Sequence, residues 1–254
     1  MSAPFDPVAA ADILLRVRAG AARPAGLPVT PPDVAAAYAV QGQVLRRLGG
    51  RVSWKMAMLG GCDRQTAAMP ASEVFTSGAT VAGLPPDAAI EVETAFVLGA
   101  GLRPDSHPSD ALAAVAEVRL AFEIVGSRYA DRTAVPPLEA MADSFSSAAI
   151  VLGDAIADWP LVLDMPLDLT LVLDGRPVAS PEQTPTLAGT ADFLLWLARH
   201  AAAHGLSLSA GDVVITGARI GPVPLRGATR ASASGTSARV NAALSFRDPE
   251  PDDG

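Results

Sequence analysis

Apolar positions at helical spacing characterise the first fifty residues of the chain. They predict one helix at Val8–Arg18 and a second at Val34–Leu48, which Pro31-Pro32-Asp33 opens and Gly49-Gly50 ends. After this point short apolar runs replace the helical period. The sequence therefore predicts two N-terminal helices ahead of a body of a different kind.

Short apolar and β-branched runs bounded by Gly, Pro and Ser dominate the rest of the chain, which is typical of strands. The predicted strands are Val52–Leu59, Ile90–Leu98, Val118–Val125, Ala148–Leu152, Leu167–Leu173, Arg176–Ala179, Asp212–Thr216 and Ser237–Phe246. Asp174-Gly175 between two of them is a hairpin signal. Only two helices are predicted here, at Asp110–Ala116 and Gly189–His204. Residues 60–86, with at most short strands, and 134–147 are predicted as loops.

Helices first and strands afterwards indicate an α+β fold rather than a doubly wound parallel sheet. We divide the chain into an N-terminal helical region (1–50), a strand-rich catalytic domain (51–247) and a flexible acidic tail (248–254). No glycine pattern of a dinucleotide site or phosphate loop follows a strand, and there is no Gly-x-Ser-x-Gly elbow.

Composition and charge restrict the class of protein. The chain has 254 residues, 50% hydrophobic and 18% charged, which is the make-up of an ordinary globular protein. A net charge of −8 argues against nucleic-acid binding. No apolar run approaches the roughly 18 residues of a membrane helix, and no secretion signal opens the chain. With a lone Cys62, which we interpret as a turn residue rather than a nucleophile, we expect a cytoplasmic protein.

Three glutamates have apolar neighbours. Glu91 and Glu93 alternate along a predicted strand, so their side chains point to the same face, roughly 7 Å apart. Such carboxylates repel each other unless a cation lies between them, although taken alone a solvated strand face is the simpler explanation. Glu123 lies in an apolar strand, where a buried carboxylate needs a cation, a proton or an ion pair. Arg119 and Arg128 are candidate ion-pair partners.

Lys55 is the only lysine among 19 basic residues, and it too lies in an apolar strand. A lysine retained where arginine prevails is a better candidate for a role that arginine cannot fill. A buried ammonium either reaches water or meets a carboxylate. Because each charge lowers the cost of burying the others, Lys55 and the three glutamates form a consistent set. A shared divalent cation accounts for all three carboxylates, and separate ion pairs are the alternative.

Several motifs, in their order and spacing, are similar to those of a known family. They are Ala36-Ala37-Tyr38-Ala39-Val40-Gln41, Trp54-Lys55-Met56, Glu91-x-Glu93 with Phe96-Val97-Leu98, Phe122-Glu123-Ile124-Val125-Gly126-Ser127-Arg128, Ala210-Gly211-Asp212-Val213-Val214-Ile215-Thr216-Gly217 and Gly221-Pro222-Val223. Over nearly its whole length the chain resembles the 2-oxopent-4-enoate hydratase and 4-oxalocrotonate decarboxylase family of the fumarylacetoacetate hydrolase superfamily.

The resemblance implies N-terminal helices followed by a mixed β-roll with embedded helices. It implies that Mg²⁺ or Mn²⁺ is held by three carboxylates and that Lys55 lies beside the substrate for proton transfer or charge stabilisation. The implied metal ligands are Glu91, Glu93 and Glu123, and the implied substrate contacts are Ser127, Arg128, Asp143 and Thr216. Hard cations prefer oxygen, and three carboxylates leave about three of six positions open for a 2-oxo acid. The metal would then stabilise an enolate as a Lewis acid.

Some family positions differ in this chain. Ser144 stands where the family has Asn after Asp143, and Ala218 replaces the serine of a Thr-Gly-Ser motif. The lysine motif continues as Met-Ala-Met-Leu-Gly instead of Ile-Gly-Leu-Thr-Ser, and the loop at 70–75 is reshaped. These departures point to a divergent substrate or a weakened activity.

Histidine usage bears on hydrolysis, the superfamily's other reaction, which typically needs a histidine base. His107 lies in a Ser/Pro-rich loop, and His200 and His204 lie one turn apart on a predicted helix. An i,i+4 metal pair is conceivable there, but without a zincin glutamate a surface helix is favoured. Hydrolysis is therefore disfavoured.

We expect a metal-dependent lyase that hydrates a 2-hydroxy-2,4-dienoate, a small 2-oxo acid in its enol form. Decarboxylation of a vinylogous 2-oxo acid is the alternative, since both reactions use the metal and an enolate. A non-catalytic partner subunit is the third possibility, which Ser144 and Ala218 motivate. A homo-oligomer is expected, as is a complex with a partner enzyme of the pathway, and neither nucleic acid nor membrane is an expected partner.

Overall fold

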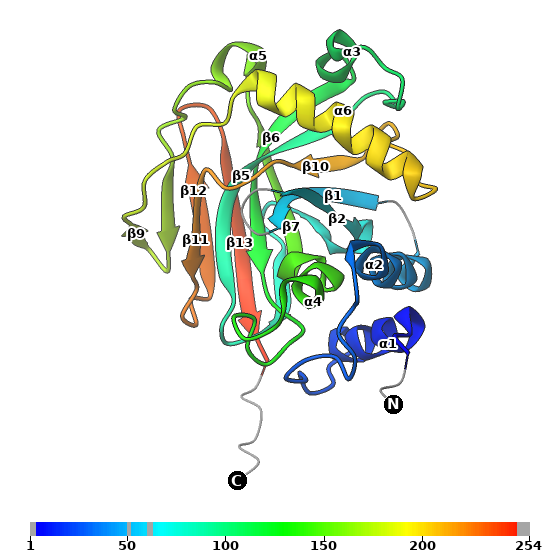
Figure 1. Cartoon of the computed structure of the whole chain (residues 1–254). Coiled ribbons are helices and arrows are strands. Elements are labelled where there is room, and N and C mark those ends of the chain that lie inside the picture. Colours follow the sequence, from blue (N-terminus) through cyan, green and yellow to red (C-terminus); the bar gives the residue numbers. More distant parts are fainter. Residues whose placement is uncertain (1–3, 50–51, 60–62, 248–254) are drawn as a thin grey trace.

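The computed structural model describes residues 4–49, 52–59 and 63–247 (Figure 1). The predicted acidic tail at 248–254 and the predicted turn around Cys62 lie outside this range. Two N-terminal helices precede a body of curled mixed sheets, which confirms the predicted α+β class. The division into the three regions proposed from the sequence stays a prediction.

Both predicted N-terminal helices are present. Helix α1 spans Pro7–Arg18 and α2 spans Val34–Leu48, and an aspartate caps each N-terminus by accepting a backbone N–H bond. The two helices pack on each other and on α4 (Pro137–Ala142) in an apolar cluster of their own, around Leu14 and Val40. Helix α2 also contacts β2, which lies at one edge of the larger sheet (Figure 1).

The larger sheet has eight strands in the order β2-β1-β10-β5-β6-β7-β3, with β11 also paired to β5. The bounds are β1 Val52–Leu59, β2 Asp63–Pro70, β3 Val74–Thr76, β5 Ala89–Leu98, β6 Val115–Val125, β7 Ser147–Ala155, β10 Val213–Ile215 and β11 Ile220–Pro224. The pairs β1–β10 and β3–β7 are parallel, and the remaining pairs are antiparallel. The sheet is strongly curled, so strands that are not neighbours face each other (Figure 1).

The smaller sheet has five strands in the order β4-β13-β12-β8-β9. Its bounds are β4 Thr80–Leu84, β8 Thr170–Leu173, β9 Arg176–Val178, β12 Arg230–Ser234 and β13 Arg239–Phe246. Asp174-Gly175 forms the β8–β9 hairpin that the sequence predicted. Helix α6 (Leu187–Ala203), α3 (Pro108–Ala113) and α5 (Trp159–Val162) complete the body, together with the one-turn 3₁₀ segments η1 (Ala71–Glu73) and η2 (Ser144–Ser146).

The two faces of the larger sheet have different neighbours. One face contributes Trp54, Phe96 and Phe122 to the main core, which includes α6 and the smaller sheet. The other face contributes a separate buried cluster, which we call the inner apolar floor. Its fully or largely buried members are Met69, Ala95, Ala121, Ile150, Val213 and Ile215. Because side chains alternate, the glutamates of β5 and β6 lie on the face of this floor.

Several segments differ from the predictions. Residues 60–86, predicted as loop, contain the eight-residue β2, because β1 supplies a full antiparallel partner to a run with little β-propensity of its own. The predicted loop at 134–147 contains α4, and β11, β12 and α5 were not predicted. The short helix begins at Pro108 with a His107 cap and ends before Val115, so Val115–Val125 is strand.

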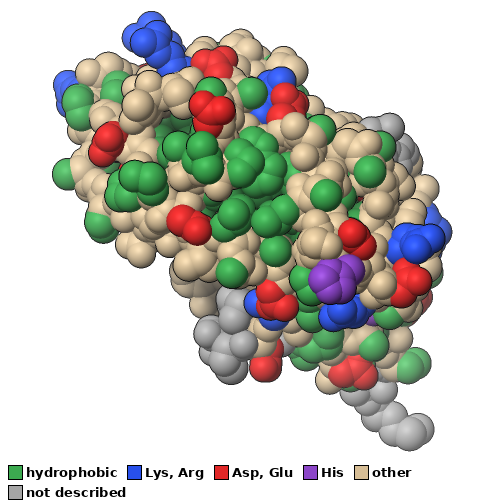
Figure 2. Space-filling model, turned by 90° about the horizontal axis from the view of Figure 1, so that it is seen from above, with side chains coloured by type: hydrophobic (Ala, Val, Ile, Leu, Met, Phe, Trp, Pro, Cys, Tyr) green, Lys and Arg blue, Asp and Glu red, His purple; other side chains and the backbone are tan. Residues whose placement is uncertain are grey.

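The face seen from the side of α5 and α6 has a large apolar area with acidic side chains around it (Figure 2). In the described chain the most exposed large apolar side chains are Leu161, at 77%, and Met165, at 55%, in and just after α5. None of the helices in the described part is both long enough and apolar enough to span a membrane.

Candidate metal centre and active site

The three sequence-predicted glutamates converge on the inner face of the curled sheet. Glu91 and Glu123 are direct cross-strand partners in the β5–β6 ladder, and Glu93 lies two residues further along β5. One carboxylate oxygen from each lies within 4.8 Å of the other two. Glu93 and Glu123 are only 1% and 0% exposed, and Glu91 is half-buried. The solvated strand face that explains Glu91 and Glu93 in isolation is therefore wrong.

Lys55 approaches the same carboxylates from β1. Its Nζ lies 2.5 Å from Oε1 of Glu123, and its side chain is almost completely buried. Strands β10 and β5 separate β1 from β6 in the sheet order, so the contact depends on the curl of the sheet. The arginine partners considered for Glu123 are wrong: Arg119 pairs with Glu117, and Arg128 pairs with Asp143.

A backbone donor holds the second glutamate. The N–H of Gly217 donates to Oε2 of Glu93 at 2.8 Å. Gly217 has φ of +115°, in a region that L side chains rarely adopt, so the turn after β10 requires glycine there. Sequence reasoning did not single out Gly217 as a site residue, although its place in the Ala210–Gly217 motif was a signal.

Burial and mutual repulsion shift the protonation of this group. Burial first, and then the nearby Glu123 carboxylate, raise the pKa of Glu91 to about 7. Burial and the charges of Glu123 and Glu91 raise the pKa of Glu93 well above its ordinary value. Burial alone would lower the pKa of Lys55, but attraction to the three carboxylates outweighs it, so the pKa is raised. Lys55 is therefore an ammonium beside two glutamates, Glu91 and Glu93, whose raised pKa values make them hold protons more readily than ordinary carboxylates.

The donor set suits a hard divalent cation. Mg²⁺ and Mn²⁺ prefer carboxylate oxygens, and three such oxygens lie within reach of one position. Oε2 of Glu123 is buried and has no hydrogen-bond partner in the described part of the chain. A buried, unpartnered acceptor costs free energy, which a cation would remove. The residues present therefore fit the metal that the sequence predicted.

Three of the predicted substrate contacts form a cluster with one another. Arg128 donates through Nε to Oδ1 of Asp143 and through Nη2 to its backbone oxygen, and its backbone N–H donates to Oδ2 at 3.0 Å. Ser127 Oγ lies 3.4 Å from Oδ2 of Asp143 and accepts the N–H of Tyr129. These contacts fix the loop after β6 against the end of α4. Their roles in substrate binding stay a prediction.

The turn after Asp143 and the fourth predicted contact have unusual features. Ser144, Phe145 and Ser146 all have positive φ, between 51° and 65°, which is costly for residues other than glycine. Thr216 is buried, and its Oγ1 has no partner in the described structure. Thr216 directly precedes the Gly217 donor of Glu93, so its hydroxyl belongs to the same turn.

The histidines lie elsewhere. His107 caps α3, and His200 and His204 contact Tyr38 of α2 on the opposite side of β1 from Lys55. None of the three belongs to the carboxylate cluster.

Comparison with known proteins agrees with this geometry. The model of the fumarylacetoacetate (FAA) hydrolase C-terminal family matches residues 64–244, which is most of the chain and includes all three glutamates. The chain belongs to this family. The FAA hydrolase match begins within β2 and ends within β13, so it covers most of both sheets.

Curated relatives of this FAA hydrolase family chain include two kinds of lyase. The chain is 34% identical over 139 residues to a 4-oxalocrotonate decarboxylase of a Pseudomonas species, covering 54% of this chain and 52% of the relative. It is 35% identical over 136 residues to a 2-keto-4-pentenoate hydratase of Paraburkholderia xenovorans, covering 53% and 49%. The chain thus spans about half the length of the curated relatives that it matches.

Solved structures share the fold over a longer range. The 4-oxalocrotonate decarboxylase of Pseudomonas putida G7, complexed with magnesium and adipate, superposes with a TM-score of 0.75 at 21% identity. The match covers 94% of this chain and 97% of that one. A second structure of that enzyme, with calcium and acetate, gives 0.73 at 22%. The N-terminal helices and the curled sheets are therefore a shared architecture.

Proposed function

We propose that this chain is a metal-dependent lyase that acts on a small 2-oxo acid, and that it hydrates a 2-hydroxy-2,4-dienoate. The observation on which the proposal depends is the convergence of three glutamates, with Lys55 on Glu123, in an otherwise apolar interior. The names of the relatives, hydratases and a decarboxylase, support the reaction class.

Glu91, Glu93 and Glu123 would hold Mg²⁺ or Mn²⁺, as magnesium is present in the related decarboxylase structure. When bound, the ion would supply Lewis-acid stabilisation of negative charge on the substrate's oxygens. The N–H of Gly217 orients Glu93, and the ammonium of Lys55 orients Glu123. The chain's own residues therefore fix two of the three ligands before any ion binds.

Lys55 is the proposed proton-transfer residue. Its raised pKa keeps a proton on Nζ near neutral pH, next to the place where the substrate would bind. In hydration, the proton and the hydroxyl of one water add to the diene, and an ammonium can supply the proton or stabilise the enolate. The inner apolar floor limits the access of water to these charged groups, so the electrostatic interactions between them are stronger than in water. Ser127, Arg128, Asp143 and Thr216 are proposed to shape the substrate end of this space.

Decarboxylation of a vinylogous 2-oxo acid is the second candidate, because one curated relative is named for it. Purified protein with Mg²⁺ or Mn²⁺ should be assayed for loss of the dienoate absorbance and for CO₂ release from 4-oxalocrotonate. We expect dienoate turnover that Lys55→Ala reduces strongly while the metal content stays. Glu117→Gln on β6, away from the carboxylate cluster, is the matched control. Metal binding with turnover of neither substrate would instead support the non-catalytic role.

We propose in addition that the chain self-associates. Leu161 and Met165, in and just after α5, expose large apolar side chains. The face seen from the side of α5 and α6 also has a large apolar area (Figure 2), and exposed apolar surface of this kind is typical of interaction sites. A complex with a partner enzyme of the pathway stays a prediction from the sequence.

A further inference from the structure

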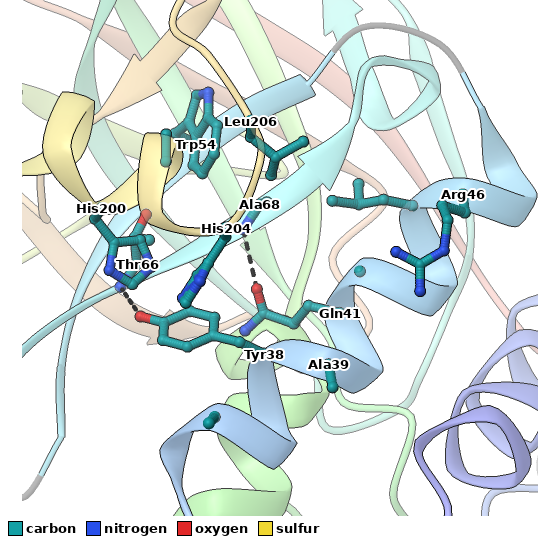
Figure 3. A pocket seen from close by; sticks show the side chains of 14 residues that line it. Tyr38, Ala39, Gln41, Arg46, Trp54, Thr66, Ala68, His200, His204 and Leu206 are labelled. Atoms are coloured by element: carbon teal, nitrogen blue, oxygen red, sulfur yellow. Dashed lines mark hydrogen bonds between the residues drawn. The ribbon is translucent and has the colours of Figure 1, made fainter. Parts of the chain in front are cut away.

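A cavity of about 430 Å³ lies between α2 and the C-terminal part of α6. We call it the α2–α6 pocket (Figure 3). Trp54 of β1 and Thr66 and Ala68 of β2 form its base, so it lies on the opposite face of β1 from Lys55. It shares none of its lining residues with the carboxylate cluster. The volume is in the range of pockets for small organic ligands.

The cavity exists because small residues occupy the pocket face of α2. Ala35, Ala39 and Gly42 recur at helical spacing and line the cavity, where larger side chains would fill it. Ala201 of α6 and Ala68 of β2 are equally small on the other walls. These small side chains therefore leave an apolar cavity between α2 and α6.

Aromatic rings form one wall of the pocket. The ring centroid of Tyr38 lies 4.5 Å from that of His200 and 4.7 Å from that of His204. His200 in turn stacks on Trp196, with 4.9 Å between centroids and 17° between planes. Burial first, and then His204, lower the pKa of His200 to about 4, so this ring is neutral near pH 7. Such a wall favours a planar ring that stacks or packs edge-on.

Most polar groups of the lining are already satisfied. Tyr38 donates to Gln65 and accepts the N–H of Thr66, and Gln41 is bonded at both ends of its amide. Thr66 donates to the backbone oxygen of Lys55. Apart from the buried Nε1 of Trp54, which has no partner in the described structure, the base of the pocket offers little to a strongly polar ligand, and an apolar body is the better fit.

The lining groups without a partner in the described structure are the guanidinium of Arg46, the indole Nε1 of Trp54 and two imidazoles, each of which can donate a hydrogen bond. Arg46 makes no ion pair or hydrogen bond within the described ranges, and its Nη1 lies 3.4 Å from the position of a Cβ on Gly42. Its guanidinium is therefore folded back along α2 to the pocket wall. The imidazoles of His200 and His204 likewise have no hydrogen bond to described residues. Among the residues that the structure describes, no Asp or Glu lines the pocket.

We propose that the α2–α6 pocket binds a small aromatic carboxylate, with its ring against Tyr38, His200 and His204 and its carboxylate at Arg46. Charge complementarity selects the anion, and the ring-lined, otherwise satisfied walls select the aromatic body. This site goes beyond the proposed function and does not depend on it. Trp54 directly precedes Lys55, so the occupant lies against the strand that positions the proposed catalytic lysine.

Calorimetric titration of the full-length protein with 2-naphthoate tests the proposal. We expect saturable binding that Arg46→Gln weakens about five- to tenfold through loss of one charge-assisted contact. Arg47→Gln is the matched control, because Arg47 is next on α2 and pairs with Asp12 instead. The neutral analogue 2-naphthalenemethanol should bind the native protein about as weakly as 2-naphthoate binds Arg46→Gln. Equal affinities of native protein and Arg46→Gln for 2-naphthoate would overturn the proposal.

Two further variants locate the site. Ala39→Leu keeps a good helix former on α2 and fills the cavity, so it should abolish binding while circular dichroism shows an unchanged fold. Glu123→Gln removes a proposed metal ligand and should leave the affinity for 2-naphthoate unchanged. If Glu123→Gln abolishes binding, or Ala39→Leu retains it, the ligand binds elsewhere and the α2–α6 pocket is not its site. The metal content of each variant, measured separately, reports on the proposed function.

Discussion

The two oxygens of Glu123 have different environments. Oε1 lies 2.5 Å from the ammonium of Lys55, whereas Oε2 is buried without a hydrogen-bond partner in the described structure. A carboxylate in this position is half satisfied by the protein itself. One carboxylate oxygen of Glu123 lies within 4.8 Å of oxygens of Glu91 and Glu93. The repulsion between these groups contributes to the raised pKa values of Glu91 and Glu93.

Glu123→Gln should therefore abolish metal retention and leave the fold largely intact. The neutral amide cannot replace the charged ligand, but it keeps the size of the side chain and a hydrogen-bond acceptor for Lys55. Elemental analysis after dialysis measures the metal, and circular dichroism checks the fold. Glu117→Gln, on the same strand, should retain the metal. Unchanged metal in Glu123→Gln would show that the ligand assignment is wrong.

Metal affinity should rise as the pH rises through about 7, where Glu91 loses its proton. Glu91, with a pKa of about 7, and Glu93, with a raised pKa, must release protons when a cation binds. Calorimetry in two buffers of different ionisation enthalpy measures that release. Without metal, the stability of the fold changes with pH in the opposite direction. The folded state keeps a proton on Glu91 that the unfolded chain loses above the ordinary pKa of 4.5, so stability falls as pH rises through about 7. A pH-independent affinity would contradict this assignment.

Gly217→Ala should weaken metal binding about tenfold and cost about 1–2 kcal/mol of stability. A Cβ is strained at φ of +115°, so the turn would shift and displace the N–H that holds Glu93. Gly227→Ala is the control for strain alone, since Gly227 also has positive φ and its Cβ would meet nothing within 4 Å. Equal metal affinity in the two variants would show that Gly217 does not contribute to the metal site.

Individual charges in apolar runs were the part of the site that the sequence could predict. Glu123 and Lys55 stand out because a buried charge demands a partner, and the structure supplies that partner. Gly217 could not be recognised in this way, because its contribution is a backbone N–H that every residue type except proline possesses. The pairing of Arg128 with Asp143 rather than Glu123 depends on which loops meet, and spacing along the chain does not determine it.

At the scale of elements, the predictions succeeded where the local pattern is strong. The helices α1 and α2 have capping aspartates and a clear period, and β5 and β6 are long β-branched runs. By contrast, β2 is rich in Ala and polar residues and becomes a strand through its partner β1. Helix α4 is short and follows a proline-rich stretch, so its helical form depends on packing against α2.

An ion pair fixes the segment that follows β10. Arg219 is 0% exposed, pairs with Glu182 at 3.1 Å and donates to the backbone oxygens of Leu163 and Met165. Arg219→Met should destabilise the protein by about 3–5 kcal/mol, because it leaves the Glu182 carboxylate without its cation and two carbonyl groups without their donor. Chemical denaturation measures the loss. Arg176→Met on the exposed strand β9 should change stability by less than about 0.5 kcal/mol, and an equal effect of both would refute this role.

At the scale of the whole molecule, the apolar face around α5 suggests how chains associate. Leu161→Glu should shift the protein towards the monomer in light scattering without changing its metal content, because it places a charge on the exposed apolar face. Asp192→Asn on α6, an exposed polar position, is the control. A monomeric native protein, or an unchanged mass of Leu161→Glu, would contradict self-association through this face.

The β5–β6 ladder has a consequence for mutations that touch no acid at all. Glu91 opposes Glu123 only because Ile90, Val92 and Phe122 select the alignment of the two strands from the other side of the sheet. A change of one residue in the strand register would place one of the two glutamates on the other face of the sheet, in the apolar core. Substitutions that loosen the packing of these apolar side chains should therefore reduce metal binding, as removal of a ligand does.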